Sequence, residues 1–328
     1  MKTVSTLSQI CLVFLLIAAA GCKKDNDYGP SDFSKFFRLH SFEVGVVPES
    51  RTVQVLFQVT DLDKKGVSKL TTSDFIVKEN EGEIDSEADL RIGQGTIPFA
   101  IRTVLLLDIT RSVEAFIPQI KEAARSLVQK KLPEQEIAIY TFDAATKAVQ
   151  TFTTDSQALL DAINSIPESG LVNSTNIYGA VIDVADLWED AYSIEGIVDG
   201  SLIIFTDGRH NASQFVTLEM AQNALGNRRA YVAALSSPDL DEVSLKKLAK
   251  DPARYFKADD VAGLEQMFLD IQSDIQSLSN SIYFLYYQSP ISDPTPFEND
   301  LIIEVRDNTN TGSDRRIVEK FNSEGFGN

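Results

Sequence analysis

One stretch decides the fold of this chain: Val104-Leu105-Leu106-Leu107-Asp108-Ile109-Thr110-Arg111-Ser112. Its first four residues form an unbroken apolar run, which is typical of a parallel strand covered on both faces. After Ser112, apolar side chains recur at helical spacing, at Ile117, Ile120, Ala124 and Leu127. A buried strand, a polar loop and an amphipathic helix in this order predict a βα unit.

The same alternation continues along the chain. Further apolar strands are predicted at 137–142, 202–206 and 230–235, and further amphipathic helices at 177–188 and 264–275. Strands alternating with helices predict an α/β fold with a doubly wound, mostly parallel sheet. In such sheets ligands bind beyond the carboxyl ends of the strands. Asp108 and Asp207 each follow an apolar strand directly, so we expect both at that edge.

Strand patterns of another kind flank this region. Between Thr52 and Asp61, apolar residues occupy alternate positions, which indicates a strand with one buried face. A similar alternation lies at 301–305, but isolated strands are not stable alone. We therefore expect the two regions to pair, so that the α/β domain is inserted into a small β-sandwich formed by the N- and C-terminal segments. This assigns 36–98 and 279–328 to the sandwich and 99–278 to the α/β domain.

The polar loop that begins at Asp108 suits a hard cation. Asp108, Thr110 and Ser112 lie two residues apart, so an extended loop presents a carboxylate and two hydroxyls in one direction. Such oxygens are ligands that Mg²⁺ prefers. The same residues could instead cap the following helix, and the pentapeptide alone favours capping. The polar loop 173–176 and Asp207 shift the interpretation towards a metal site.

Together these segments resemble a von Willebrand factor A domain with its metal-ion-dependent adhesion site. The family motif is Asp-x-Ser-x-Ser, then a loop Thr, then an Asp that ends a strand. Asp108, Thr110 and Ser112 match its first part, with Thr110 in place of the first Ser. Thr175 matches the loop Thr, and Asp207 matches the final Asp. The resemblance implies that these five residues hold Mg²⁺ or Mn²⁺ with one position open, which a protein partner fills with an acidic residue.

The N-terminus resembles a bacterial lipoprotein signal. Lys2 is followed by an apolar run at 10–20, too short to span a bilayer comfortably, and by small residues before Cys22. We expect 1–21 to be removed as a signal peptide, Cys22 to carry lipid, and 22–35 to form a tether. The protein would then be anchored in the bacterial cell envelope, with the outer membrane as the expected location and either face possible. An ordinary secretory signal with an incidental cysteine is the alternative.

Composition narrows the function. The formal net charge of the 328 residues is −18, which argues against binding nucleic acid. Cys11 and Cys22 are the only cysteines, so the processed chain would have no free thiol for catalysis or zinc. No phosphate-binding loop or nucleophile elbow is present. We therefore predict a non-enzymatic, metal-dependent binding protein. The alternatives are a structural envelope protein with a purely stabilising metal and, less favoured, a metal-assisted hydrolase.

Overall fold

The computed structural model describes residues 35–95, 97–169, 171–293 and 297–327. The predicted signal peptide, Cys22 and nearly all of the predicted tether lie outside the described residues. Within the described ranges, no helix has the length and apolar character that a membrane span requires.

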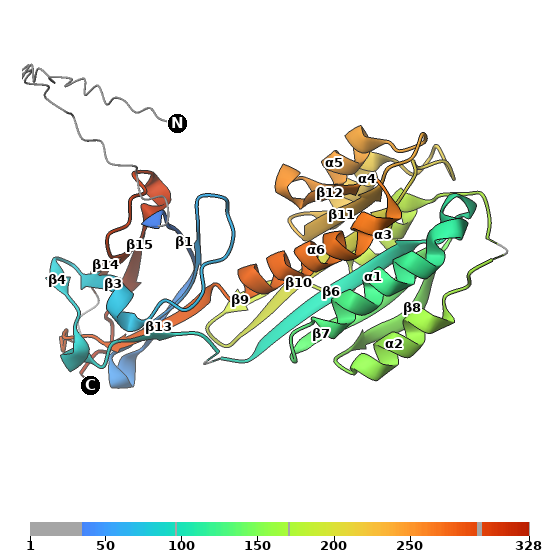
Figure 1. The fold of residues 1–328 in the computed structure, drawn as a ribbon. Coiled ribbons are helices and arrows are strands. Elements are labelled where there is room, and N and C mark those ends of the chain that lie inside the picture. Colours follow the sequence, from blue (N-terminus) through green and yellow to red (C-terminus); the bar gives the residue numbers. More distant parts are fainter. Residues whose placement is uncertain (1–34, 96, 170, 294–296, 328) are drawn as a thin grey trace, which may run out of the picture. The chain divides into compact units, whose positions relative to one another are not determined.

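In the described part of the chain, a seven-stranded sheet forms the centre of the α/β domain (Figure 1). The strand order is β12-β11-β10-β6-β7-β8, and β9 pairs with β10. The pairs among β12, β11, β10, β6 and β7 are parallel, whereas β8 and β9 join antiparallel. The strands are β6 (Phe99–Asp108), β7 (Gln135–Phe142), β8 (Thr146–Thr153), β9 (Ala191–Ser193), β10 (Gly196–Thr206), β11 (Arg229–Leu235) and β12 (Tyr255–Ala258).

Helices cover both faces of this sheet, which confirms the doubly wound arrangement. Leu105 packs in the hydrophobic core formed with α1, α2 and α6, whereas its neighbour Leu106 packs in the core formed with α3, α4 and α5. Because successive strand side chains point to opposite faces, a run of apolar residues fills both layers. The helices are α1 (Ile117–Gln129), α2 (Ser156–Ser165), α3 (Ile177–Ala185), α4 (Leu218–Leu225), α5 (Glu242–Ala249) and α6 (Leu264–Ser279).

Two antiparallel sheets flank the α/β domain, and each contains strands from both ends of the chain. Tyr283 of β13 pairs with Phe57 of β2, and Ile303 of β14 pairs with Val77 of β3. Side chains of both sheets share one hydrophobic core, so the predicted pairing of the N- and C-terminal segments is confirmed. One sheet contains β1 (Arg38–Val47), β2 (Thr52–Thr60), β13 (Ile282–Gln288) and β5 (Arg91–Gly93), and the other contains β15 (Arg316–Asn322), β14 (Glu298–Val305), β3 (Phe75–Glu79) and β4 (Gly82–Glu83).

A buried polar network ties β9, β10, β11 and the end of α6 together. The Asp199 carboxylate accepts hydrogen bonds from the Tyr192 hydroxyl at 2.6 Å, the Ser279 hydroxyl at 2.6 Å and the Arg229 guanidinium at 2.9 Å. Burial by itself raises the pKa of Asp199, but the Arg229 charge and these hydrogen bonds outweigh it, and the net pKa lies below its ordinary value. The Asp199 carboxylate is therefore buried, and its negative charge is compensated by Arg229 and by the hydrogen bonds that it accepts.

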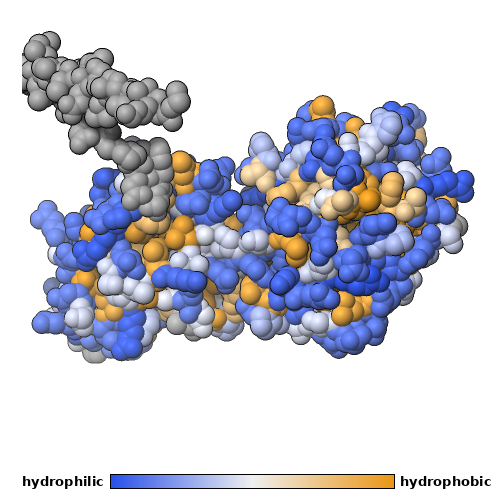
Figure 2. Space-filling model, viewed as in Figure 1, coloured by the Kyte–Doolittle hydropathy of each residue, from blue (hydrophilic) through white to orange (hydrophobic). Residues whose placement is uncertain are grey.

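Side chains also connect the sandwich with the α/β domain. The Tyr192 ring stacks on Phe42 of β1, with centroids 4.3 Å apart, and the Ile194 amide donates to the Glu43 carboxylate at 2.6 Å. The Ser277 hydroxyl of α6 donates to the carbonyl oxygen of Gly66 at 3.0 Å. The face seen in Figure 2 is mostly hydrophilic, with apolar side chains in small separate areas, in keeping with an acidic chain.

Candidate metal centre

The candidate centre lies at the carboxyl ends of the adjacent parallel strands β6 and β10. Leu107 pairs with Phe205, so the following residues, Asp108 and Thr206, emerge side by side at the sheet edge. The chain leaves β6 towards β7 on one side and leaves β10 towards β11 on the other. Strand order therefore reverses between these two strands, and such a switch point opens the crevice in which α/β sheets bind ligands.

Asp108 organises the first loop of the site. Its Oδ1 accepts hydrogen bonds from the Thr110 amide at 2.9 Å and the Thr110 hydroxyl at 2.6 Å. Its Oδ2 accepts from the Thr206 hydroxyl at 2.7 Å, and the Thr110 and Ser112 hydroxyl oxygens lie 3.1 Å apart. Three oxygen-bearing side chains of the loop are thus held in one cluster, as their spacing predicts.

The structure does not support the alternative in which the polar residues of this loop cap the following helix. Thr110 precedes the 3₁₀ helix η5 (Arg111–Phe116), but its side chain makes no capping hydrogen bond. Helix α1 begins after Phe116 and has no side-chain cap either. The Thr110 hydroxyl is directed to Asp108 instead, so the polar loop is organised around that carboxylate rather than around a helix end.

The second strand end joins this cluster through Asp207. The Ser112 hydroxyl donates a hydrogen bond to Asp207 Oδ1 at 2.8 Å, and Ser237 donates to the Asp207 carbonyl oxygen. Asp108 and Asp207 are both buried, with exposed fractions of 0% and 4%. The site therefore places two nearly inaccessible carboxylates beside a set of hydroxyls.

Thr175 lies on the third segment and lines the same pocket as Ser112 and Asp207, which has a volume of about 470 Å³. Its amide donates to the Asn211 side-chain oxygen at 2.7 Å, and the Asn211 amide donates to the Thr175 carbonyl at 3.0 Å. This double contact ties the loop before α3 to the loop after β10. Within the described residues the Thr175 hydroxyl has no hydrogen-bond partner, which leaves its oxygen available to a ligand.

The electrostatics of the two carboxylates favour a nearby cation. Burial raises the pKa of Asp108 to about 6, although hydrogen bonds from Thr110 and Thr206 oppose the shift and the Asp207 charge adds to it. Burial also raises the pKa of Asp207, against the Ser112 hydrogen bond and with the Asp239 charge adding. Both charged forms are thus disfavoured by loss of solvent, and a divalent ion would compensate them.

The donor set fits a hard cation. It consists of the carboxylates of Asp108 and Asp207 and the hydroxyls of Thr110, Ser112 and Thr175, all of them oxygen ligands. Across the part of the chain that the structure describes, no group of three or more His, Cys, Asp or Glu side chains has a geometry that could hold a metal. Hydroxyl oxygens would therefore supply part of the coordination in this pocket.

Comparison with known families assigns the region of the chain that contains this site. The model of the von Willebrand factor type A domain matches residues 103–270, just over half of the chain. The chain belongs to the von Willebrand factor type A family. The matched region runs from β6 to α6 and includes the whole candidate centre, so we refer to it below as the VWA domain.

Several solved structures are similar to this chain at low sequence identity. A von Willebrand factor type A protein from Catenulispora acidiphila is 12% identical, with 90% of this chain and 75% of that chain covered and a TM-score of 0.49. Proximal thread matrix protein 1 from the mussel byssus, with a zinc-occupied MIDAS motif, is 15% identical, with 60% and 49% covered and a TM-score of 0.47. BatB from Bacteroides thetaiotaomicron is 16% identical, with 54% and 100% covered and a TM-score of 0.44.

This chain therefore spans about half the length of the mussel protein. A search of curated proteins found no match. Likeness at these identities concerns the fold only.

Several residues in or next to the pocket lined by Ser112, Thr175 and Asp207, called the VWA pocket below, were not predicted from sequence. Thr206 holds Asp108, Asn211 holds Thr175, and Arg209 and Asp239 line the pocket. Asp239 follows β11 by a few residues, so its place beyond a parallel strand was a usable signal. The role of Thr206 depends on the register between β6 and β10, which local sequence does not reveal.

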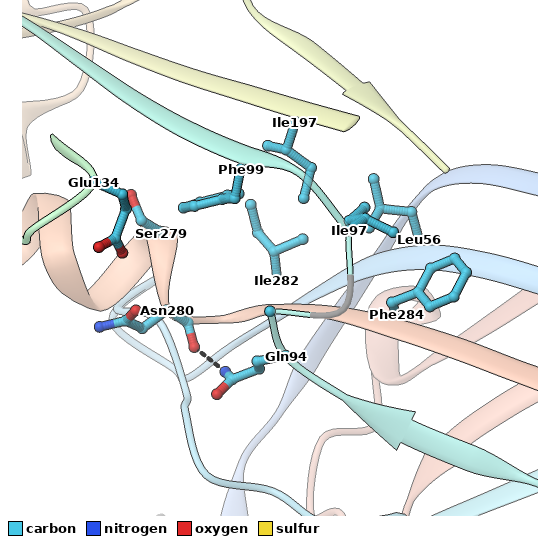
Figure 3. Close-up of a pocket in the computed structure, with 11 residues that line it drawn as sticks. Leu56, Gln94, Ile97, Phe99, Glu134, Ile197, Ser279, Asn280, Ile282 and Phe284 are labelled. Atoms are coloured by element: carbon cyan, nitrogen blue, oxygen red, sulfur yellow. Dashed lines mark hydrogen bonds between the residues drawn. The ribbon is translucent and has the colours of Figure 1, made fainter. Parts of the chain in front are cut away.

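A second pocket is mainly apolar, in contrast to the oxygen-rich pocket at the carboxyl ends of the strands. An apolar pocket of about 360 Å³ lies at the opposite end of the strands, where Phe99 of β6 and Ile197 of β10 face Ile282 of β13 (Figure 3). The Gln94 side chain donates to the carbonyl oxygen of Asn280 at its edge. The walls of this pocket are mainly apolar, so the oxygen-rich pocket at the carboxyl edge remains the candidate for an ion.

Proposed function

We propose that this protein is a lipid-anchored cell-envelope protein whose VWA domain captures a protein partner through a divalent cation. VWA domains are in general interaction modules, and the finer statement rests on the site. The observation that carries it is the hydrogen-bonded cluster of Asp108, Thr110, Ser112 and Asp207, of which Ser112 and Asp207 line a pocket of about 470 Å³.

The chemistry of capture follows from the donor set. Two carboxylates balance the charge of Mg²⁺ or Mn²⁺, and the Thr110, Ser112 and Thr175 hydroxyls supply neutral oxygens. Mg²⁺ prefers six oxygen ligands and keeps water where the protein supplies none, so beside these five protein side chains a bound ion would keep an exchangeable water. An acidic side chain of a partner can replace that water and complete the shell.

The pocket offers better support for binding than for hydrolysis. A hydrolase needs a general base beside the metal-bound water. His210 is the histidine nearest in sequence to the candidate ligand Asp207, and it is therefore considered as a general base. However, its ring stacks on Tyr178, with ring centroids 4.4 Å apart, and its Nε2 lies 2.7 Å from the carbonyl oxygen of Ser213. The ring is thereby engaged in holding the loop, which favours a structural role for it.

A matched pair of substitutions at Thr175 tests the binding function. Thr175→Ala removes a hydroxyl that has no internal partner in the described chain, whereas Thr175→Ser keeps it. We expect Thr175→Ala to weaken Mg²⁺ binding by on the order of tenfold or more in calorimetry, and Thr175→Ser to stay near the unmodified protein. Crosslinking pull-downs from envelope fractions should then retain a partner with Mg²⁺ and release it with EDTA, in parallel with metal affinity.

A purely stabilising metal is the second candidate. It is favoured by the complete burial of Asp108, because a cation would offset the cost of that buried charge whether or not a partner binds. Under this candidate EDTA lowers the melting temperature but leaves crosslinked partners unchanged. Loss of partners with EDTA or Thr175→Ala while the fold persists supports capture instead.

The anchoring part of the proposal concerns residues outside the described structure. We propose that cleavage leaves Cys22 as a lipidated N-terminus and that 22–35 serve as a tether. Metabolic labelling with a fatty acid and membrane fractionation test it. The native chain should be labelled and sediment with membranes, whereas Cys22→Ser should be neither labelled nor retained. Labelling that survives Cys22→Ser contradicts the anchor.

A further inference from the structure

Arg209 is a cation in the VWA pocket that has no partner among the residues that the structure describes. It lines the pocket with Ser112, Thr175 and Asp207 and is exposed to solvent. Among the described residues its guanidinium makes no hydrogen bond and no ion pair. The chain contains 48 acidic residues against 30 Lys and Arg, so carboxylates are plentiful, and Arg229 for example pairs with Asp199 at 2.9 Å.

The backbone that carries Arg209 is fixed on both sides. Asp207 precedes it by two residues and is bonded to Ser112, while Asn211 follows it by two and makes a double contact with Thr175. The His210 ring stacks on Tyr178 next to it. Arg209 is therefore presented from a held loop, which lowers the backbone conformational entropy lost when its guanidinium binds a ligand.

The chemistry of this side chain points to a carboxylate. A guanidinium offers a planar set of N–H donors that matches a carboxylate with two parallel hydrogen bonds. A partner carboxylate that ligates the cation would take the open coordination position, and Arg209, which lines the same pocket, presents a second positive centre. A pocket of about 470 Å³ has room for the ends of two acidic side chains.

We propose that Arg209 binds a second carboxylate of the partner, so that the site recognises an acidic segment with one carboxylate on the metal and another on Arg209. The inference rests on the proposed metal-dependent capture and names the partner's chemistry. The net charge of −18 repels an acidic partner at long range, and Asp239 adds a negative charge in the pocket itself. Of the residues that line the pocket, only Arg209 is a Lys or Arg, so the positive charge in the pocket would come from the ion and from Arg209.

Synthetic peptides test this with defined probes. The probes are capped glycine peptides with one Asp, or with two Asp separated by no, one or two Gly. Titrations use the protein with saturating Mg²⁺, the variants Arg209→Gln and Arg209→Lys, and Arg315→Gln as a control. Arg315 is an exposed arginine next to β15 whose side chain makes no hydrogen bond or ion pair in the described structure.

At least one two-Asp peptide should bind the native protein about tenfold more tightly than the one-Asp peptide, since charge-assisted pairs are strong. Arg209→Gln should abolish that advantage and weaken the one-Asp peptide much less than the two-Asp peptide, because only the long-range attraction of the removed charge is lost for the one-Asp peptide. Arg209→Lys should retain part of it, and Arg315→Gln should retain all of it. Mg²⁺ alone should bind Arg209→Gln at least as tightly as the native protein, because a nearby positive charge has been removed.

The outcomes separate the two proposals. If no peptide binds better with Mg²⁺ than with EDTA, metal-dependent capture fails and takes this inference with it. If the one-Asp peptide binds with Mg²⁺ but no two-Asp peptide gains, or the gain persists in Arg209→Gln, only the role of Arg209 is overturned. An equal loss of one-Asp and two-Asp binding in Arg209→Gln would mean that Arg209 contacts the metal-bound carboxylate itself, which also overturns the second-carboxylate proposal.

Discussion

The Ser112 hydroxyl donates a hydrogen bond to the Asp207 carboxylate over 2.8 Å, although 95 positions separate the two residues in the chain. This bond joins the loop after β6 to the loop after β10. Each loop supplies one of the two candidate carboxylate ligands, so the candidate metal site exists only where the two strand ends meet. Perturbing either loop should therefore affect both metal binding and the stability of this edge.

Mg²⁺ should stabilise the VWA domain through Asp207. At a Mg²⁺ concentration of about 100 times Kd, linkage predicts a gain of about 2.7 kcal/mol in the free energy of unfolding. Asp207→Asn keeps the size of the side chain but removes its charge, so it should lose most of that gain. Thermal and urea unfolding with Mg²⁺ or EDTA measure the difference. An equal gain in Asp207→Asn would place the ion elsewhere.

Asp199→Asn should destabilise the fold strongly. The substitution leaves the Arg229 guanidinium buried without its carboxylate, and breaking one side of a buried pair costs about 3–5 kcal/mol. Glu136→Gln is the matched control, because its partner Arg102 is more exposed and surface pairs contribute about 0–1 kcal/mol. Urea unfolding of both variants gives the comparison. Similar losses in the two variants would contradict the central role of the Asp199 network.

The Asp199 network also predicts an acid dependence. The pKa of Asp199 is lowered in the folded state, so near pH 4 the unfolded chain binds more protons than the folded one. Its stabilising contribution is complete above the ordinary Asp pKa of about 3.9 and is lost as the pH falls through the lower folded value. The stability difference between the native protein and Asp199→Asn should be constant above about pH 5 and shrink below about pH 4. The prediction would be contradicted if the difference in the free energy of unfolding between the two proteins grew as the pH was lowered.

Gly66→Ala should disturb the contact between the sandwich and α6. A Cβ at Gly66 would lie 1.9 Å from the Ser277 carbonyl oxygen, a backbone atom that cannot rotate away. Overpacking of this kind typically costs about 1–3 kcal/mol. Gly93→Ala is the control, because its Cβ would meet nothing within 4 Å. Urea unfolding should show a loss for the first variant and little change for the second.

The predicted site residues differ in how far the neighbouring sequence alone predicts their place in the site. The loop from Asp108 to Ser112 gathers its oxygen atoms largely through its own sequence, because a spacing of two residues brings these side chains together once the strand ends. Thr175 is different, since a single Thr in a polar loop carries no such signal. The family resemblance selects it, and its place in the pocket depends on the contact with Asn211.

The sequence by itself determined the fold class of this protein and the order of its elements. Unbroken apolar runs mark strands buried on both faces, and alternating residues mark the sandwich strands, because hydrophobic periodicity is a local property. Only the tertiary structure decided that Thr206 holds Asp108, that Arg209 shares a pocket with Thr175, and that Asp199 meets Arg229 and Ser279. These contacts depend on the register between neighbouring strands and on loops distant in the chain, which no local pattern encodes.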